Sequence, residues 1–243
     1  MPARPRPFFH RHRLLAVALA LVLAAVSVWA VRLVSLQREV SAYRTYWSVP
    51  HGSPGGLRYV ALGDSAAQGI GASDPQHGYV SLLAERLRRS TGRPVEVLNL
   101  SRSGARIDDV LRDQVPQLAS LHADVVTVDV GGNDVVSYDA VDWARGAARL
   151  CDALPAGRTV VADVPWFMHG RWERRAADAR RVLQADCAAR AIPVAPLRDA
   201  FVRHGWAGMF TLYAADWFHP NDHGHRIWAD ALFPPLACEV GRS

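Results

Sequence analysis

The sequence predicts an α/β domain, a three-layer α/β/α sandwich built around a parallel five-stranded sheet. Two observations predict this fold. From residue 57 onward, β-type runs alternate with segments of helical spacing, and small, polar, glycine-containing turns follow the first three runs. Strands separated by helices pair in parallel through right-handed crossovers, and this arrangement places helices on both faces of the sheet.

Each element follows from the local pattern of apolar residues. We expect five strands, at residues 58–62, 95–100, 124–130, 159–164 and 192–196. The expected helices cover residues 79–89, 107–121, 141–154, 171–190 and about 222–232. Asn221 or Asp222 can cap the first turn of the last helix.

The positive charge of the chain is concentrated near its N-terminus. The 243 residues carry a formal net charge of +5, and all 28 basic residues are Arg. Six of these lie in residues 1–38, which contain no Asp or Glu, so residues 39–243 hold 22 Arg against 23 acidic residues. The globular part is close to neutral, and a basic surface that binds nucleic acid is not indicated.

A basic N-terminus precedes an uncharged apolar stretch from Leu14 to Val31. Its eighteen residues reach the lower length of a membrane-spanning helix and exceed the apolar part of a cleavable signal, about 7 to 15 residues. We expect a single-pass signal anchor in the cell membrane, with the N-terminus in the cytoplasm and the globular domain outside it. The alternative is a secreted protein whose signal peptide is cleaved near Val28-Trp29-Ala30.

These features divide the chain into three parts. Residues 1–36 form the basic N-terminus and anchor, residues 37–56 form a linker, and residues 57–240 form the globular domain. The linker is polar and closes on Pro and Gly, which is typical of a tether.

Three cysteines allow at most one disulfide bond within the chain. Outside the cytoplasm, Cys151 and Cys187 are the pair we expect, because both lie in predicted helices of the same half of the domain. Burial of all three as small apolar side chains is the alternative. Because no C-x-x-C spacing occurs, zinc-ribbon and thioredoxin-like chemistry have no support.

The turns that follow the predicted strands contain the candidate reactive groups. In an open parallel sheet the ligand site lies beyond the carboxyl ends of the strands. Ser65 lies at the first of these strand-to-helix turns and is a candidate nucleophile. His219, before the last helix, is its candidate base. Asp216 lies three residues earlier, on the same side of one turn, and can orient the imidazole ring.

A developing oxyanion needs fixed donors, and the backbone N–H groups of Ser65 and Gly104 and the amide of Asn133 can supply them. Trp166 and Phe167 follow the fourth strand and are candidates for substrate binding, although core packing explains them equally well. His219, His223 and His225 could suggest a metal site. We expect none, because His219 serves the serine and the other two are solvent-exposed or supporting groups.

Four segments together resemble the SGNH hydrolases, also called the GDSL esterase/lipase family. They are YVALGDSAAQGIG with Ser65, NLSRSGAR with Gly104, VDVGGND with Asn133, and DWFHPNDHGH with Asp216 and His219. The resemblance covers residues 57–236, and Ala66 departs from it where the family name has Leu. It implies a flavodoxin-like fold, no metal or organic cofactor, and hydrolysis of esters or thioesters through an acyl-enzyme.

We therefore expect a serine esterase or lipase whose partner is a small-molecule, lipid or saccharide ester. An acyltransferase of the same fold, acting on a sugar or lipid of the cell envelope, would use the same chemistry. It would differ only in excluding water from deacylation. A non-catalytic binding module is the remaining alternative, and the complete set of reactive residues argues against it.

Overall fold

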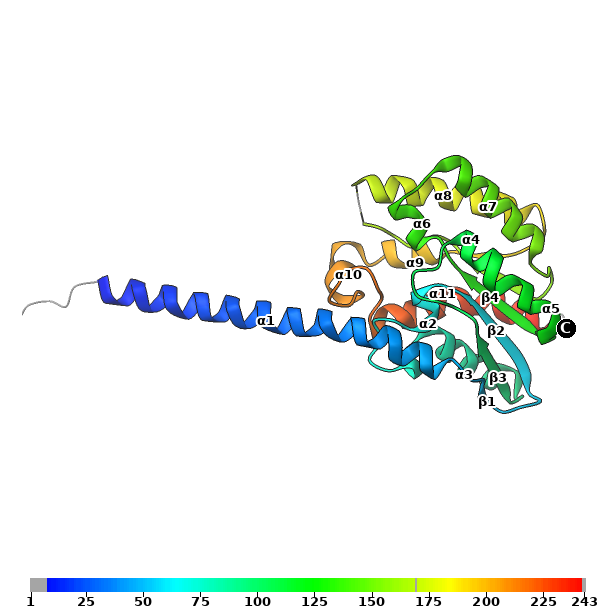
Figure 1. Cartoon of the computed structure of the whole chain (residues 1–243), viewed down its shortest axis with the longest axis horizontal. Helices are drawn as coiled ribbons and strands as arrows, with labels where there is room; N and C mark the ends of the chain where they lie inside the picture. Colours follow the sequence, from blue (N-terminus) through cyan, green and yellow to red (C-terminus); the bar gives the residue numbers. More distant parts are fainter. Residues whose placement is uncertain (1–7, 169, 242–243) are drawn as a thin grey trace, which may run out of the picture.

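A computed structural model describes residues 8–168 and 170–241. It contains a sheet with strand order β1-β3-β2-β4-β5-β6 and helices on both faces (Figure 1). Its strands are β1 (His51–Gly52), β2 (Leu57–Gly63), β3 (Val95–Asn99), β4 (Val125–Asp129), β5 (Thr159–Ala162) and β6 (Val194–Ala195). The five predicted strands pair in parallel, which confirms the fold class. The sixth strand, β1, pairs antiparallel with β3 at the edge of the sheet, in a segment expected to be linker.

The helices include four short ones that local periodicity does not predict, α2, α6, α9 and α10. In chain order they are α1 (Phe8–Tyr46), α2 (Ser65–Gln68), α3 (Tyr79–Thr91), α4 (Ile107–Asp109), α5 (Leu118–Leu121), α6 (Gly132–Val136), α7 (Ala140–Ala153), α8 (Gly170–Ala188), α9 (Leu197–Val202), α10 (Gly205–Thr211) and α11 (Asp222–Val240). A short 3₁₀ helix covers Pro75–His77.

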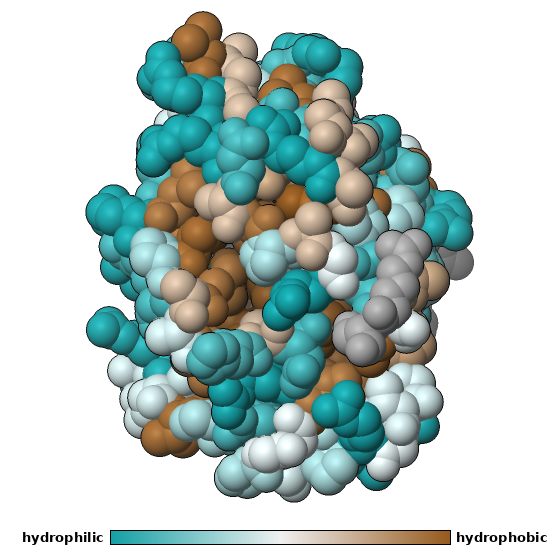
Figure 2. All heavy atoms as spheres, turned by 90° about the vertical axis from the view of Figure 1, so that its right-hand side faces the viewer, coloured by the Kyte–Doolittle hydropathy of each residue, from teal (hydrophilic) through white to brown (hydrophobic). Residues whose placement is uncertain are grey.

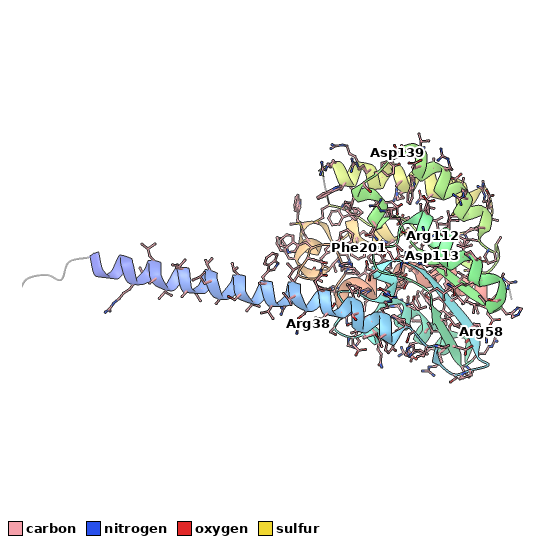
Figure 3. The ribbon with its side chains drawn as sticks, viewed as in Figure 1. Arg38, Arg58, Arg112, Asp113, Asp139 and Phe201 are labelled. Carbon is pink, nitrogen blue, oxygen red and sulfur yellow. A yellow bond between two sulfur atoms is a disulfide. The ribbon has the colours of Figure 1, made fainter. Side chains whose placement is uncertain are left out.

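Alternate side chains of β2 enter two separate cores. Tyr59 and Ala61 pack on the face covered by α3, α9 and α11, whereas Val60 and Leu62 pack on the face covered by α7 and α8. On the first face Phe201 of α9 (Figure 3) meets Trp228 of α11 edge-on, with 5.4 Å between ring centroids. Both faces of the sheet are buried, as the continuous apolar runs of its strands require.

Residues 107–121, expected to be one helix, form a broken helical segment. α4 leads into a π-helical turn at Val110–Gln114 and a 3₁₀ turn at Val115–Gln117 before α5 begins. Pro116 has no N–H for the helical ladder, and its ring crowds the preceding turn. The π turn also directs Gln114 inward, where it is buried. Arg112 and Asp113 of this segment form an ion pair at the surface (Figure 3).

The C-terminal helix extends beyond the predicted end near residue 232. α11 continues through Pro234 and Pro235 to Val240. Leu236 is fully buried in the core, so packing of the last turns offsets the hydrogen bonds that the two prolines cannot form.

The segment expected to be a tether is ordered and packs on the domain. α1 runs without interruption from the apolar stretch to Tyr46, and its first part projects away from the domain (Figure 1). Leu36, Tyr43 and Trp47 are buried against the domain. Composition suggested a tether because this segment is polar overall, but Val40, Tyr43, Tyr46 and Trp47 lie on the side that packs. Arg13–Tyr46 is long and apolar enough to include a membrane span.

Cys151 of α7 and Cys187 of α8 form a disulfide bond, which confirms the expected pair. The two helices pack side by side on one face of the sheet, so their cysteines meet although 36 residues separate them. Cys238 is a free, exposed cysteine.

Candidate active site

The candidate site lies where the strand order reverses. β2 lies between β3 and β4, so the connection from β2 to β3 and the connection from β4 to β5 leave toward opposite sides of the sheet. A crevice opens at such a point beyond the carboxyl ends of the strands. Ser65 follows β2, Gly104 follows β3, Asn133 follows β4, and His219 lies in the loop before α11.

The backbone around Gly63 holds Ser65 at the start of α2. A Cβ at Gly63 would lie 2.2 Å from the carbonyl oxygen of Asp129, so only glycine allows β2 and β4 to approach this closely. The buried Gln114 side chain binds both backbone groups of Gly63, at 2.8 and 2.9 Å. Asp64 caps α2 by accepting a hydrogen bond from Ala66 N–H at 3.0 Å. The N–H of Ser65 lies in the first turn of α2, where helices provide no backbone acceptor.

Ser65, His219 and Asp216 form one chain of hydrogen bonds. His219 Nε2 lies 2.8 Å from Ser65 Oγ, and His219 Nδ1 lies 2.5 Å from Asp216 Oδ2. Since a carboxylate only accepts, Nδ1 carries the proton and Nε2 is left to accept the serine proton. This arrangement can generate a serine nucleophile.

A tight turn aligns Asp216 with His219. Asp216 Oδ1 accepts hydrogen bonds from the N–H groups of Phe218 and His219, each at 3.0 Å. Trp217, between them, has a φ of 58°, a left-handed conformation that costs about 1 to 3 kcal/mol for a residue with a side chain. Burial alone would raise the pKa of Asp216, but the hydrogen bond and charge of His219 and the two N–H donors lower it. Asp216 is therefore ionised at neutral pH.

The two predicted oxyanion donors outside α2 lie at neighbouring strand ends. Gly104 has a φ of 81°, a conformation that favours glycine, and a Cβ there would meet open space. Asn133 Nδ2 donates to Ala105 O at 3.0 Å and to Asp64 Oδ2 at 3.2 Å. Both hydrogens of this amide thus have protein acceptors, and the bond to Asp64 is the longer of the two.

Three wholly or partly buried carboxyl groups follow β2 and β4 or end β4 near the site. Burial raises the pKa of Asp64 to about 6, despite the N–H of Ala66 and the nearby charge of His219. Burial also raises the pKa of Asp129 far above its ordinary value, and the charge of Asp64 adds to the effect. Asp134, which accepts from Ile107 N–H at 3.3 Å, has its pKa raised to about 6 by burial.

A small pocket of about 40 Å³ lies beside Ser65 and His219. The predicted substrate-binding residues Trp166 and Phe167 both line it, together with Met168 and Phe218 from the two neighbouring loops. The Trp166 carbonyl accepts a hydrogen bond from Tyr213 Oη at 3.0 Å. Phe167 N–H donates to Glu173 at 2.9 Å, and Arg198 binds the same carboxylate. The loop after β5 is therefore fixed from two sides.

Sequence reasoning missed the residues that support the site. Buried Gln68 accepts from Ser103 N–H at 2.9 Å and donates to Ser101 O at 3.2 Å, so it holds the loop that carries Gly104. Gln114 holds Gly63 in the same way. Gln68 and Gln114 could have been found from the sequence as glutamines on otherwise apolar helical faces. A buried amide needs hydrogen-bond partners, so such a glutamine indicates a loop that it holds.

α1 also contacts the loops of the site. Glu39 accepts a hydrogen bond from Gly71 N–H at 3.2 Å, and Gly71 packs against Pro220, next to His219. Burial raises the pKa of Glu39. Further along α1, Tyr43 Oη donates to Ala72 O at 2.7 Å, and Trp47, just after the helix, donates from Nε1 to Gln68 O at 2.9 Å.

The three clustered histidines have different environments. His225, expected to be solvent-exposed or supporting, is fully buried: it accepts from Tyr79 N–H at 3.3 Å and donates to Ile70 O at 3.2 Å. Burial lowers its pKa to about 4, so this ring is neutral and structural. The first turn of α11 carries His225 inward, whereas His223 is exposed. The described residues contain no group of three or more His, Cys, Asp or Glu side chains arranged to hold a metal ion.

Comparison with known proteins gives a family match over most of the domain. The sequence model of the GDSL-like lipase/acylhydrolase family matches residues 61–227. No curated protein matches the chain.

Solved structures resemble this chain over three quarters of its length. LAE5, described as an α/β hydrolase from the Lake Arreo metagenome, has a TM-score of 0.63 at 21% identity, covering 75% of this chain and 96% of its own. TesA has a TM-score of 0.61 at 22% identity, covering 75% and 99%. The acetylxylan esterase Axe2 from Geobacillus stearothermophilus has a TM-score of 0.56 at 20% identity, covering 77% and 95%. At these identities the likeness concerns the fold.

Proposed function

The chain belongs to the GDSL-like lipase/acylhydrolase family and is an ester-hydrolysing enzyme, and from this premise we propose that it is a serine esterase that works through an acyl-enzyme on Ser65. The observation that carries the proposal is the hydrogen-bonded chain from Ser65 Oγ through His219 to Asp216. Asp216, His219 and Ser65 are then the catalytic triad.

In the first half-reaction, Ser65 Oγ attacks the acyl carbonyl carbon while its proton moves to His219 Nε2. Asp216 stabilises the resulting imidazolium, which is the role its lowered pKa supports. When the tetrahedral intermediate collapses, the bond between the carbonyl carbon and the leaving oxygen or sulfur breaks. His219 gives its proton to the departing alcohol or thiol, and the acyl group stays on Ser65.

In the second half-reaction, a water molecule gives a proton to His219 Nε2 and attacks the acyl-enzyme carbonyl. Collapse of this intermediate breaks the bond to Ser65 Oγ, and His219 returns the proton to that oxygen. The products are the carboxylic acid and the free enzyme. In both halves, the N–H groups of Ser65 and Gly104 and the amide of Asn133 stabilise the oxyanion. Trp166 and Phe167 contact the acyl group in the pocket beside Ser65.

The test is replacement of the nucleophile in the full chain. Ser65→Ala should remove nearly all hydrolysis of p-nitrophenyl acetate and all labelling by a fluorophosphonate probe. Ser120→Ala is the matched control, because Ser120 is exposed and bonds only to Gln117 O in its own helical segment. Unchanged turnover in Ser65→Ala would contradict the nucleophile assignment, and absence of labelling in the folded native chain would favour a binding module.

We further propose that α1 is an uncleaved signal anchor that places the domain outside the cytoplasm. The apolar stretch continues without a break into the helix that packs on the domain, and Trp29 at its end donates to Ala215 O at 2.8 Å. Full-length protein should therefore partition with membranes and retain its original N-terminus. A mature N-terminus near residue 31 would show instead that the chain is secreted after cleavage.

A further inference from the structure

A wide groove runs between α1 and the end of the domain that carries the candidate site. Its volume is about 1040 Å³. On α1 it is lined by one face of the helix, including Ala25, Val28 and Trp29, and on the domain side by residues such as Phe210 of α10 and Trp217. Near its other end lie Arg32, the first charge after the apolar stretch, and Glu39.

The groove adjoins the pocket beside Ser65. Tyr213 and Trp217 line both spaces, so these two side chains form the wall between them. Trp217 is 46% exposed, and Phe210 packs edge-on against it with 5.5 Å between ring centroids. The groove and the pocket beside Ser65 are therefore neighbouring spaces on either side of Trp217.

The groove lies at the level of the proposed membrane boundary. Ala24 and Val31 are seven residues apart, so this part of α1 rises about 10 Å along the helix axis. The groove thus includes the last turns of the stretch that would span the bilayer. Because Leu36, Tyr43 and Trp47 are buried against the domain, the domain holds a defined position at the end of the span. Figure 1 shows α10 beside α1 on the side toward which α1 projects.

Exposed aromatic side chains gather near the same end of the domain. Among the described residues after α1, the exposed Trp and Phe side chains are Trp172, Trp206, Phe210, Trp217 and Phe218, which lie at the start of α8, on α10 and in the loop before α11. The opposite end of the molecule presents mostly hydrophilic side chains around a hollow where hydrophobic ones lie (Figure 2). Trp residues are enriched where proteins meet the membrane–water interface.

We propose that the groove along α1 admits the acyl chain of a long-chain ester held in the bilayer and leads it to Ser65. This inference rests on the proposed esterase function and on the uncleaved anchor. It assigns the substrate class: an amphiphilic ester that stays in the leaflet next to the domain while its carbonyl reaches the serine. Apolar groove residues replace the contacts that the acyl chain makes with neighbouring lipids.

The test fills the groove and compares two substrates. Full-length enzyme is reconstituted in vesicles of phosphatidylethanolamine and phosphatidylglycerol, with p-nitrophenyl palmitate in the vesicles or p-nitrophenyl acetate in the water. Ala25→Trp should lower the palmitate rate about tenfold more than the acetate rate, because the acetyl group needs no groove. Ala30→Trp is the matched control, since Ala30 lies roughly 140° around the helix from Ala25 and does not line the groove.

A second variant on the domain side keeps the test independent of α1. Phe210→Ser removes an apolar wall and should also lower the ratio of palmitate to acetate rates. An unchanged ratio in both groove variants, or an equal loss in Ala30→Trp, overturns the proposed route. Wild-type enzyme that cleaves acetate but not palmitate also overturns it and leaves the esterase function standing. Wild-type enzyme that cleaves neither substrate overturns the proposed function itself.

Discussion

Asp216 and Asp64 are two carboxyl groups close to Ser65 with opposite electrostatic environments. Asp216 is partly exposed and faces His219 and two N–H donors, and its pKa is lowered. Asp64 is buried, caps α2 and meets the neutral amide of Asn133, and its pKa is raised to about 6. Asp216 hydrogen-bonds the ring that becomes cationic and stabilises its charge directly, whereas Asp64 hydrogen-bonds neutral donors and mainly fixes their positions, although the charge of His219 also reaches it. The comparison predicts that the two residues contribute very differently to catalysis.

The largest effect should come from Asp216→Asn. Without the carboxylate, His219 loses the partner that sets its tautomer and stabilises the imidazolium, so kcat should fall by about 10⁴. Steady-state kinetics with p-nitrophenyl acetate measures this, and circular dichroism verifies the fold. Asp230→Asn is the control, because Asp230 is exposed and pairs only with Arg86 in a surface ion pair. A loss of less than about tenfold would remove Asp216 from the triad.

Asn133→Ala should have the next largest effect. It removes a donor proposed for the oxyanion, and kcat and kcat/KM should fall together by about 10² to 10³. The same assay measures both constants. A rise in KM at constant kcat would instead assign Asn133 to binding of the ground state.

Asp64→Asn should lower kcat by roughly tenfold, which corresponds to the loss of about one hydrogen bond. The new amide can still cap Ala66 N–H but places a second NH₂ group opposite Asn133. The Asn133 amide stays in the site with one partner fewer, so the loss should be smaller than in Asn133→Ala. A loss as large as that in Asp216→Asn would contradict the division of roles between the two carboxylates.

Asp64→Asn and Asp216→Asn should change the pH dependence of stability in opposite directions. Folding raises the pKa of Asp64 from 3.8 to about 6, so its protonated form stabilises the native state, and this stability is lost as pH rises through that range. Folding lowers the pKa of Asp216, so its contribution is present above 3.8 and is lost as pH falls. Relative to wild type, Asp64→Asn should gain unfolding free energy between pH 4 and 7. Asp216→Asn should lose unfolding free energy relative to wild type as pH rises toward 4, because only the wild type gains the contribution of the ionised Asp216.

Urea unfolding of the same proteins at several pH values measures these differences. Other buried carboxyl groups, such as Asp163, have raised pKa values as well. The difference between each variant and the wild type cancels the contributions of groups that do not interact with the substituted residue; for Asp64 it includes the effect of its charge on Asp129. Parallel stability curves for Asp64→Asn and wild type would show that Asp64 does not titrate in this range.

Local sequence patterns sufficed for the five parallel strands of the sheet and for the residues proposed to react. Apolar runs mark where parallel strands begin and end, and the ends of parallel strands meet at one edge of the sheet. Ser65, Gly104 and Asn133 could therefore be placed together from sequence. The spacing of Asp216 and His219 on one turn likewise fixes their mutual contact, which the structure shows at 2.5 Å. These features depend on neighbours within a few residues.

Only the tertiary structure decided how α1, the 107–121 segment and the buried polar groups are arranged. The same polar segment after the apolar stretch could serve as a tether or as a docked helix, and burial of Tyr43 and Trp47 against distant loops decides between them. Gln114 and His225 find partners 51 and 155 residues away, at Gly63 and Ile70. Hydrogen-bond partners so far apart have no local signal, because they exist only once the core has brought the segments together. The sequence by itself thus determined the five parallel strands and the residues proposed to react, and the tertiary structure decided how α1 is placed beside the site.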